Sequence, residues 1–233
     1  MSKMTRILVL DGSAAGDAAH GMAACVVQTG DAYSVVAQTQ SAGKQAAEGI
    51  GLLAAQVLAQ AGWQAGAESQ PQLVGVVVGP GSFTGLRASC ATAAGYALGV
   101  GAPLVGVTRG EALRPQLEAL VTEAGACDGW MLVTAARRGR VFVETGQGVQ
   151  AVALADWQPP AGRWLVAGDA AETLPMPDGA LLRSDITTPT AEQIAHAVCA
   201  RHAGVLSPRD ALPLYVDPPE AKLPAAGLRS APV

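Results

Sequence analysis

Hydrophobic residues in the chain alternate between short continuous runs and stripes with helical spacing. The run LVGVVVG at 73–79 has no polar position, so it predicts a central strand that is buried on both faces. A turn signal at 29–32 separates two other runs and predicts a hairpin. Strands are predicted in this part of the chain at residues 6–10, 22–28, 33–38, 73–79 and 102–107.

Apolar residues spaced three and four apart predict helices between these strands. The first helix is expected over 44–61, with Ile50, Leu53 and Val57 on one face, and the second over 83–100. The resulting order is βββαβαβ over residues 1–107. A second, smaller α/β half is predicted over 108–205, with helices at 110–124 and 190–203 and strands at 130–135, 140–145 and 163–168. A tail rich in proline and glycine follows at 206–233.

Composition narrows the class of protein. Half of the 233 residues are apolar and 4% are aromatic, so we expect a packed core that is built largely from small side chains. A net charge of −4 argues against a broad basic surface for RNA. The four cysteines form no CxxC pair, which favours reduced thiols in a cytoplasmic protein. No apolar run approaches the ~20 residues of a membrane span.

The stretch GPGSFTGLR, residues 79–87, joins the central strand to the second helix. Its first two glycines permit backbone angles that other residues avoid, and Ser82 is placed to cap the helix. Helix starts of this kind can bind phosphate, but a P-loop needs a lysine after its last glycine, and here Leu86 follows. Phosphate binding therefore stays open beside the favoured reading, a structural turn between strand and helix.

GPGSFTGLR resembles the signature of the TsaB (YeaZ) family, whose members assist in the biosynthesis of threonylcarbamoyladenosine in tRNA. The turn Asp11-Gly12-Ser13 and the segments PLVGVT, ARRGRVF and PLYV are similar to other parts of the family pattern. The resemblance spans most of the chain and is strongest up to about residue 145. It implies the actin-like ATPase fold of acetate kinase, Hsp70 and actin (an RNase H-like fold), with two α/β halves.

The sequence also departs from the family pattern. Gly12 stands where threonine is usual, and no histidine lies near Gln45, at the start of the first helix. Ala135 and Arg140 replace an aspartate and a glutamate, and Asp217 falls where an arginine is common. Each departure removes a group that could have touched a nucleotide.

The resemblance implies a platform subunit without catalytic residues of its own. It would bind and activate TsaD, which transfers a threonylcarbamoyl group to N6 of the adenosine 3′ of the anticodon in tRNAs that read ANN codons. TsaE would be a further partner, tRNA would be reached through the complex, and ATP would be used by the complex, with no cofactor in this subunit. The surface expected to bind TsaD, or a second copy, comprises Glu48, Gly51, Ala55, Leu86, Arg87, Ala94 and Leu98, beside the signature loop Gly79, Pro80, Gly81, Ser82, Phe83, Thr84 and Gly85.

The two predicted helices carry four glycines, Gly49, Gly51, Gly95 and Gly99. An interior glycine costs about 1 kcal/mol relative to alanine, and close approach of a neighbouring backbone is the usual compensation. That neighbour is either a partner protein or another helix of the same chain.

A second hypothesis is a small-molecule kinase or ATPase of the same fold. Asp11 and Ser13 would contact phosphate and the 79–84 loop would form a wall. No metal site is predicted, because His196 and His202 are six residues apart and face different sides of a helix.

Overall fold

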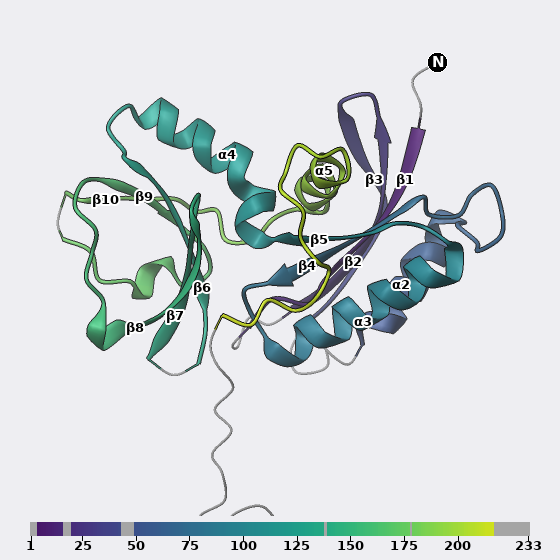
Figure 1. The fold of residues 1–233 in the computed structure, drawn as a ribbon, viewed down its shortest axis with the longest axis horizontal. Coiled ribbons are helices and arrows are strands. Elements are labelled where there is room, and N and C mark those ends of the chain that lie inside the picture. The colour runs from purple at the N-terminus through teal and green to yellow at the C-terminus, as the bar shows by residue number, and fades with distance from the viewer. Residues whose placement is uncertain (1–3, 16–19, 43–48, 138, 178, 217–233) are drawn as a thin grey trace, which may run out of the picture.

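The computed structural model describes residues 4–15, 20–42, 49–137, 139–177 and 179–216, which form two five-stranded sheets with helices around them (Figure 1). In the first sheet, two antiparallel strands lie on one side of β1 and two parallel strands lie on the other. Its strands are β1 (Met4–Asp11), β2 (His20–Thr29), β3 (Ala32–Ala42), β4 (Leu73–Gly79) and β5 (Leu104–Thr108), in the order β3-β2-β1-β4-β5.

The second sheet repeats this topology. Two antiparallel strands lie on one side of β6 and two parallel strands lie on the other. Its strands are β6 (Gly129–Ala135), β7 (Arg140–Thr145), β8 (Gly148–Ala153), β9 (Trp164–Ala167) and β10 (Leu181–Arg183), in the order β10-β9-β6-β7-β8, with short 3-10 helices η2 (Leu154–Asp156) and η3 (Ala171–Thr173). The protein is therefore built from two halves of matching sheet topology.

The two halves exchange helices, because the helix that follows each sheet packs on the other sheet. α2 (Ile50–Ala61) and α3 (Phe83–Val100) cover one face of the first sheet. α4 (Arg109–Ala124) follows the first sheet, but its Leu113 and Leu117 pack on Trp130 and other residues of the second. α5 (Ala191–His202) follows the second sheet, but its Ile194 and Val198 pack on the other face of the first. Each half thus completes the core of the other.

The strongest sequence signals agree with the structure. β4 and α3 have the predicted bounds, because every residue of β4 is buried and the Ser82 side chain accepts a hydrogen bond from the N–H of Gly85 at the start of α3. Thr190 caps α5 as predicted, although its capping-box partner is Gln193, one position beyond Glu192.

The predicted elements differ from the structure in three places where the sequence signal is weak. β8 and β10 were not predicted, since β8 is only partly buried and β10 has three residues. β3 continues beyond the predicted end to Ala42. Gly49 is the N-cap of α2 and not an interior residue, so of the two glycines assigned to this helix only Gly51 lies inside it. The boundaries of the predicted halves, at 107/108 and 205/206, stay a prediction.

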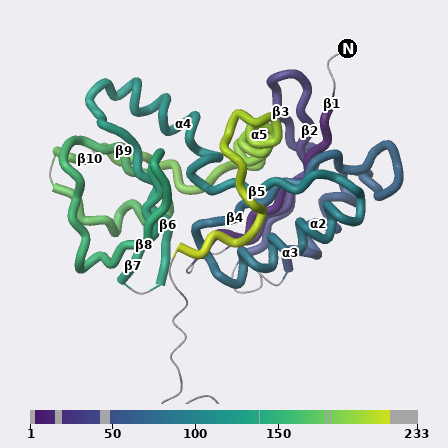
Figure 2. The backbone as a smooth tube through the Cα atoms, in the orientation of Figure 1, coloured from purple at the N-terminus to yellow at the C-terminus, as the bar shows by residue number. Residues whose placement is uncertain are grey.

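The described part of the predicted tail is residues 206–216, and its segment 207–216 lies on the body of the protein (Figure 2). We call it the strap. It leaves α5 and passes Gly106 of β5, where Ala211 packs so closely that a Cβ on Gly106 would lie 2.9 Å from its Cα. The N–H of Leu214 then donates to the carbonyl of Val78 at 2.8 Å. The strap thereby carries the chain from the α5 face of the first sheet to the α3 face. Asp217 lies outside the described residues.

Candidate functional site

The signature loop packs backbone against backbone on the turn after β1. A Cβ on Gly81 would lie 1.8 Å from the carbonyl oxygen of Ser13, and one on Gly85 would lie 2.0 Å from that of Gly12. The N–H of Ser82 donates to the Ser13 carbonyl at 2.8 Å. The glycines of the loop are therefore needed to seat the start of α3 against the first strand.

Asp11 takes part in the same turn. It is 6% exposed, and its Oδ1 accepts a hydrogen bond of 2.8 Å from the N–H of Ser13. The buried Ser13 hydroxyl has no hydrogen-bond partner among the described residues. A cavity of about 290 Å³ lies beside Asp11, and its wall includes His20 and Gln38 together with the start of α5. The carboxylate of Asp11 thus has a structural role at the end of the strand.

The residues predicted to bind a partner lie mostly on one surface, the outer side of α2 and α3, which we call the α2–α3 face. Ala55, Arg87 and Ala94 are exposed, Gly51 is half-buried, and Leu98 is 86% exposed. Leu86 is different: it is 2% exposed and lies inside the protein, so its side chain is not available to a partner. Glu48 lies outside the described residues.

This face has an unusual surface chemistry. Among the residues of α2 and α3, Arg87 is the only one with a charged side chain, whereas α4 carries five charged residues in 16. Leu52, which the sequence did not single out, is 63% exposed on α2. A Cβ on Gly95 or Gly99 would meet no atom within 4 Å, so nothing described in this chain uses the close approach that these glycines permit.

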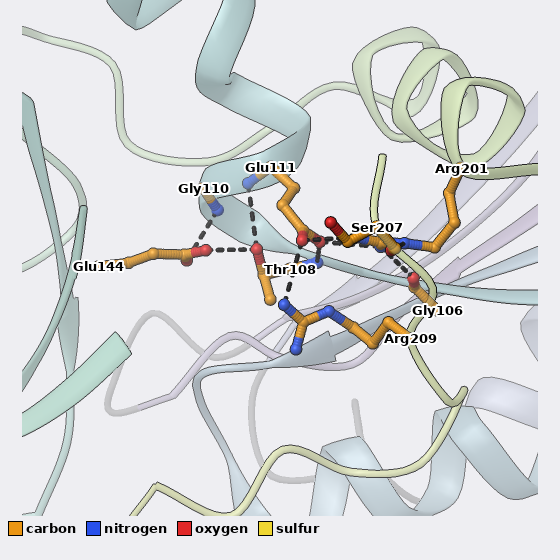
Figure 3. A network of polar contacts seen from close by, with 8 residues as sticks. All are labelled: Gly106, Thr108, Gly110, Glu111, Glu144, Arg201, Ser207 and Arg209. Atoms are coloured by element: carbon orange, nitrogen blue, oxygen red, sulfur yellow. Dashed lines mark hydrogen bonds and ion pairs between the residues drawn. The ribbon is translucent and has the colours of Figure 1, made fainter. Parts of the chain in front are cut away.

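A polar network at the start of α4 was not predicted (Figure 3). Glu144 of β7 is 3% exposed; it accepts a hydrogen bond from the Thr108 hydroxyl and another, of 2.8 Å, from the N–H of Gly110. The approach is close, since a Cβ on Gly110 would lie 2.4 Å from the carboxyl carbon of Glu144. Arg109, which is fully buried, pairs with Asp169 at 2.9 Å. The first turn of α4 is therefore tied to the second sheet.

The same turn is also tied to α5 and the strap. Glu111 receives two hydrogen bonds from Arg201, of 2.5 and 2.9 Å, and lies 3.1 Å from Arg209. Arg201 also donates to the carbonyls of Gly106 and Ser207. The capping box Thr108-x-x-Glu111 is the one part of this network that the sequence signals directly.

The two glutamates of the network differ in acidity. Burial raises the pKa of Glu144 to about 7, and the hydrogen bonds from Thr108 and Gly110 offset only part of that effect. Burial also acts to raise the pKa of Glu111, but its hydrogen bonds with Arg201 and Thr108 outweigh it and hold the pKa at about 2. Both are explained as parts of a structural junction between the two halves.

Comparison with known proteins identifies the family. Residues 35–186, about two thirds of the chain, match the profile of TsaD, described as tRNA N6-adenosine threonylcarbamoyltransferase. The chain belongs to the TsaD family. Its family membership connects it with threonylcarbamoyladenosine modification of tRNA. The matched region contains the signature loop, the α2–α3 face and Glu144, while Asp11 and α5 lie outside it.

Solved structures support the fold. A Pseudomonas aeruginosa protein described as uncharacterized, with similarity to peptidase YeaZ, superposes with a TM-score of 0.62 at 20% identity, over 91% of this chain and all of that chain. YeaZ from the same organism gives a TM-score of 0.60 at 21% identity, over 91% of this chain and 99% of that one. No curated protein sequence matches the chain. The predicted resemblance to TsaB (YeaZ) and the predicted actin-like α/β fold with two halves are confirmed.

Two departures from the family pattern have a structural explanation. Gly12 replaces the usual threonine at a point where a Cβ would lie 2.6 Å from the carbonyl oxygen of Gly85. At Ala135, which replaces an aspartate, the backbone N–H donates to Asp169, so a carboxylate reaches this strand end from another loop. Nothing described explains the arginine at position 140.

Metal sites and membrane-spanning helices are both absent from the described ranges. These ranges contain no group of three or more His, Cys, Asp or Glu residues arranged to hold a metal ion. None of the helices in those ranges has both the length and the apolar character that a membrane crossing requires.

Proposed function

We propose that this chain is a non-catalytic platform subunit that binds and activates the TsaD transferase through the α2–α3 face. In the complex, TsaD would transfer the threonylcarbamoyl group to N6 of the adenosine 3′ of the anticodon in tRNAs that read ANN codons. TsaE would join the assembly in the cytoplasm, and ATP would be used by the complex. A second copy of this chain would use the same face when TsaD is absent.

The observation that carries the proposal is the nearly uncharged surface of two exposed helices. Leu52 and Leu98 are largely exposed, and Gly95 opens onto empty space. An exposed apolar surface of this kind marks an interaction site. A standard interface buries about 800 Å² on each partner. Glycines and alanines let two helix pairs approach closely, which would recover the free energy that interior glycine costs.

Other features fit a subunit without chemistry of its own. The signature loop fixes the start of α3 by backbone contacts with Gly12 and Ser13, and Asp11 holds its own turn. The chain carries a net charge of −4, so the phosphates of tRNA would be contacted mainly by other subunits.

The test is complex formation with TsaD from the same organism, followed by size-exclusion chromatography and calorimetry. The double variant Leu98→Arg/Gly51→Arg places two charges on the face, and we expect it to abolish the complex. Val205→Arg is the matched control, because Val205 is 77% exposed on the turn after α5, remote from this face. Binding of the double variant with wild-type affinity would refute the proposal.

A further inference from the structure

The strap ends in a cluster of exposed rings at the first turn of α3. The rings of Tyr215 and Phe83 lie 5.4 Å apart between centroids, with 38° between their planes. The guanidinium carbon of Arg87 lies 4.6 Å from the centroid of the Phe83 ring. Tyr215 is 52% exposed and Phe83 is 47% exposed. We call these three residues the ring cluster.

Contacts along the strap fix the position of Tyr215. The strap is held at its start by the hydrogen bond from Arg201 to Ser207 and by the ion pair of Arg209 with Glu111. It is held near its end by the hydrogen bond from Leu214 to Val78. The Tyr215 ring is therefore placed before any partner binds, which lowers the entropy lost on binding.

The ring cluster continues the α2–α3 face. Phe83 and Arg87 are one helical turn apart on α3, and Ala94 and Leu98 lie two and three turns further along the same side. Tyrosine, tryptophan and arginine are the types most enriched among residues that dominate interface energies, and phenylalanine is also enriched in interfaces. The whole chain has only two phenylalanines and three tyrosines. One of each lies in this cluster, side by side and exposed.

We propose that the ring cluster is the anchor of the docking face, and that it receives an apolar helix of the catalytic TsaD-family partner that carries a carboxylate beside Arg87. This inference rests on the proposed function and adds the strap to the surface. Arg87 supplies the only charge on α2 and α3, and none of the ion pairs between described residues involves it. The rings would bind apolar side chains, while the guanidinium would pair with the carboxylate.

Charge favours this partner over a second copy. In a twofold contact through the same face, the described residues of α2 and α3 would offer Arg87 no carboxylate. A second copy would have to supply the acid from elsewhere: from Asp210 of the strap, or from Glu48, Asp217 or Glu220, which lie outside the described residues. Self-association through the ring cluster is therefore the competing arrangement that the experiment separates.

The experiment measures the dissociation constant of the complex between the full chain and TsaD from the same organism, at low and high salt. We expect Tyr215→Ala and Arg87→Gln each to weaken binding at least ~10-fold, as loss of a dominant interface residue does. Arg87→Gln should also flatten the salt dependence, because it removes the charge pair. Tyr215→Phe keeps the ring and should bind like the wild type, as should the control Val205→Ala.

Leu98→Arg, measured alongside, keeps the two proposals distinguishable. If Leu98→Arg abolishes the complex while Tyr215→Ala and Arg87→Gln bind normally, the ring-cluster proposal is overturned and the platform proposal stands. If Leu98→Arg also binds normally, the platform proposal fails as well. A Tyr215→Ala variant that loses only self-association, seen by sedimentation, would overturn the assignment of the cluster to TsaD.

Discussion

Among single residues, Glu144 is the one whose titration should make the stability of the protein depend most clearly on pH. Its pKa in the folded protein, about 7, lies above the ordinary value of 4.5 because the carboxyl group is buried. The folded state therefore holds the proton more tightly than the unfolded state does. The stability that this provides is complete below pH 4.5 and is lost as the pH rises through 7.

We predict that Glu144→Gln, which removes this titration, gains stability relative to the wild type as the pH rises from about 4.5 to about 7. The gain can reach at most about 1.4 kcal/mol per pH unit. Urea unfolding of both proteins at several pH values measures it. The pKa of Glu111, about 2, places its own effect between pH 4.5 and 2, outside this window. Glu118→Gln, which removes an exposed carboxylate of α4, is the control. A pH-independent difference between wild type and Glu144→Gln would contradict the prediction.

At the scale of elements, the glycines of α3 allow the requirements of folding to be tested separately from those of binding. A Cβ on Gly95 meets nothing within 4 Å, so we predict that Gly95→Ala stabilises the isolated chain by about 0.5–1 kcal/mol. The same methyl group should weaken the complex with TsaD, since the glycine permits a partner helix to approach there. Thermal unfolding and calorimetry measure the two effects.

Gly85→Ala is the contrasting variant on the same helix. Its Cβ would lie 2.0 Å from the Gly12 carbonyl oxygen, so it should destabilise the isolated chain. If Gly95→Ala stabilises the chain and leaves TsaD affinity unchanged, no partner backbone approaches α3 at that residue.

Elements differ in how far the sequence determines them. β4 and α3 were predicted to the residue, because a wholly apolar run and a capped helix start are local signals. The network around Glu144 was not predicted, because it brings together residues from Gly106 to Arg209 and depends on packing between the halves. Leu86 was assigned to the docking surface because spacing alone does not tell which side of a small-residue helix faces the sheet. The strap was expected only as a tail, because its anchors join residues that are far apart in the sequence, such as Arg209 with Glu111 and Leu214 with Val78.

For the whole molecule, the exchange of α4 and α5 implies that the two halves fold as one unit. α4 contributes Leu113 to the second sheet, α5 contributes Ile194 to the first, and the buried pair Arg109–Asp169 joins the start of α4 to the second half. Neither half keeps an intact core without the other. Cooperative unfolding is therefore expected, with a single transition.

Trp63→Phe makes this testable, because it leaves tryptophans only at 130, 157 and 164, all in the second half. We predict that tryptophan fluorescence and far-ultraviolet circular dichroism then report coincident urea transitions. Adding Asp169→Ala leaves the buried Arg109 unpaired and should destabilise the protein by about 3–5 kcal/mol. Because that loss falls on the junction, the two transitions should separate. Separate transitions already in Trp63→Phe would show that the exchanged helices do not couple the halves.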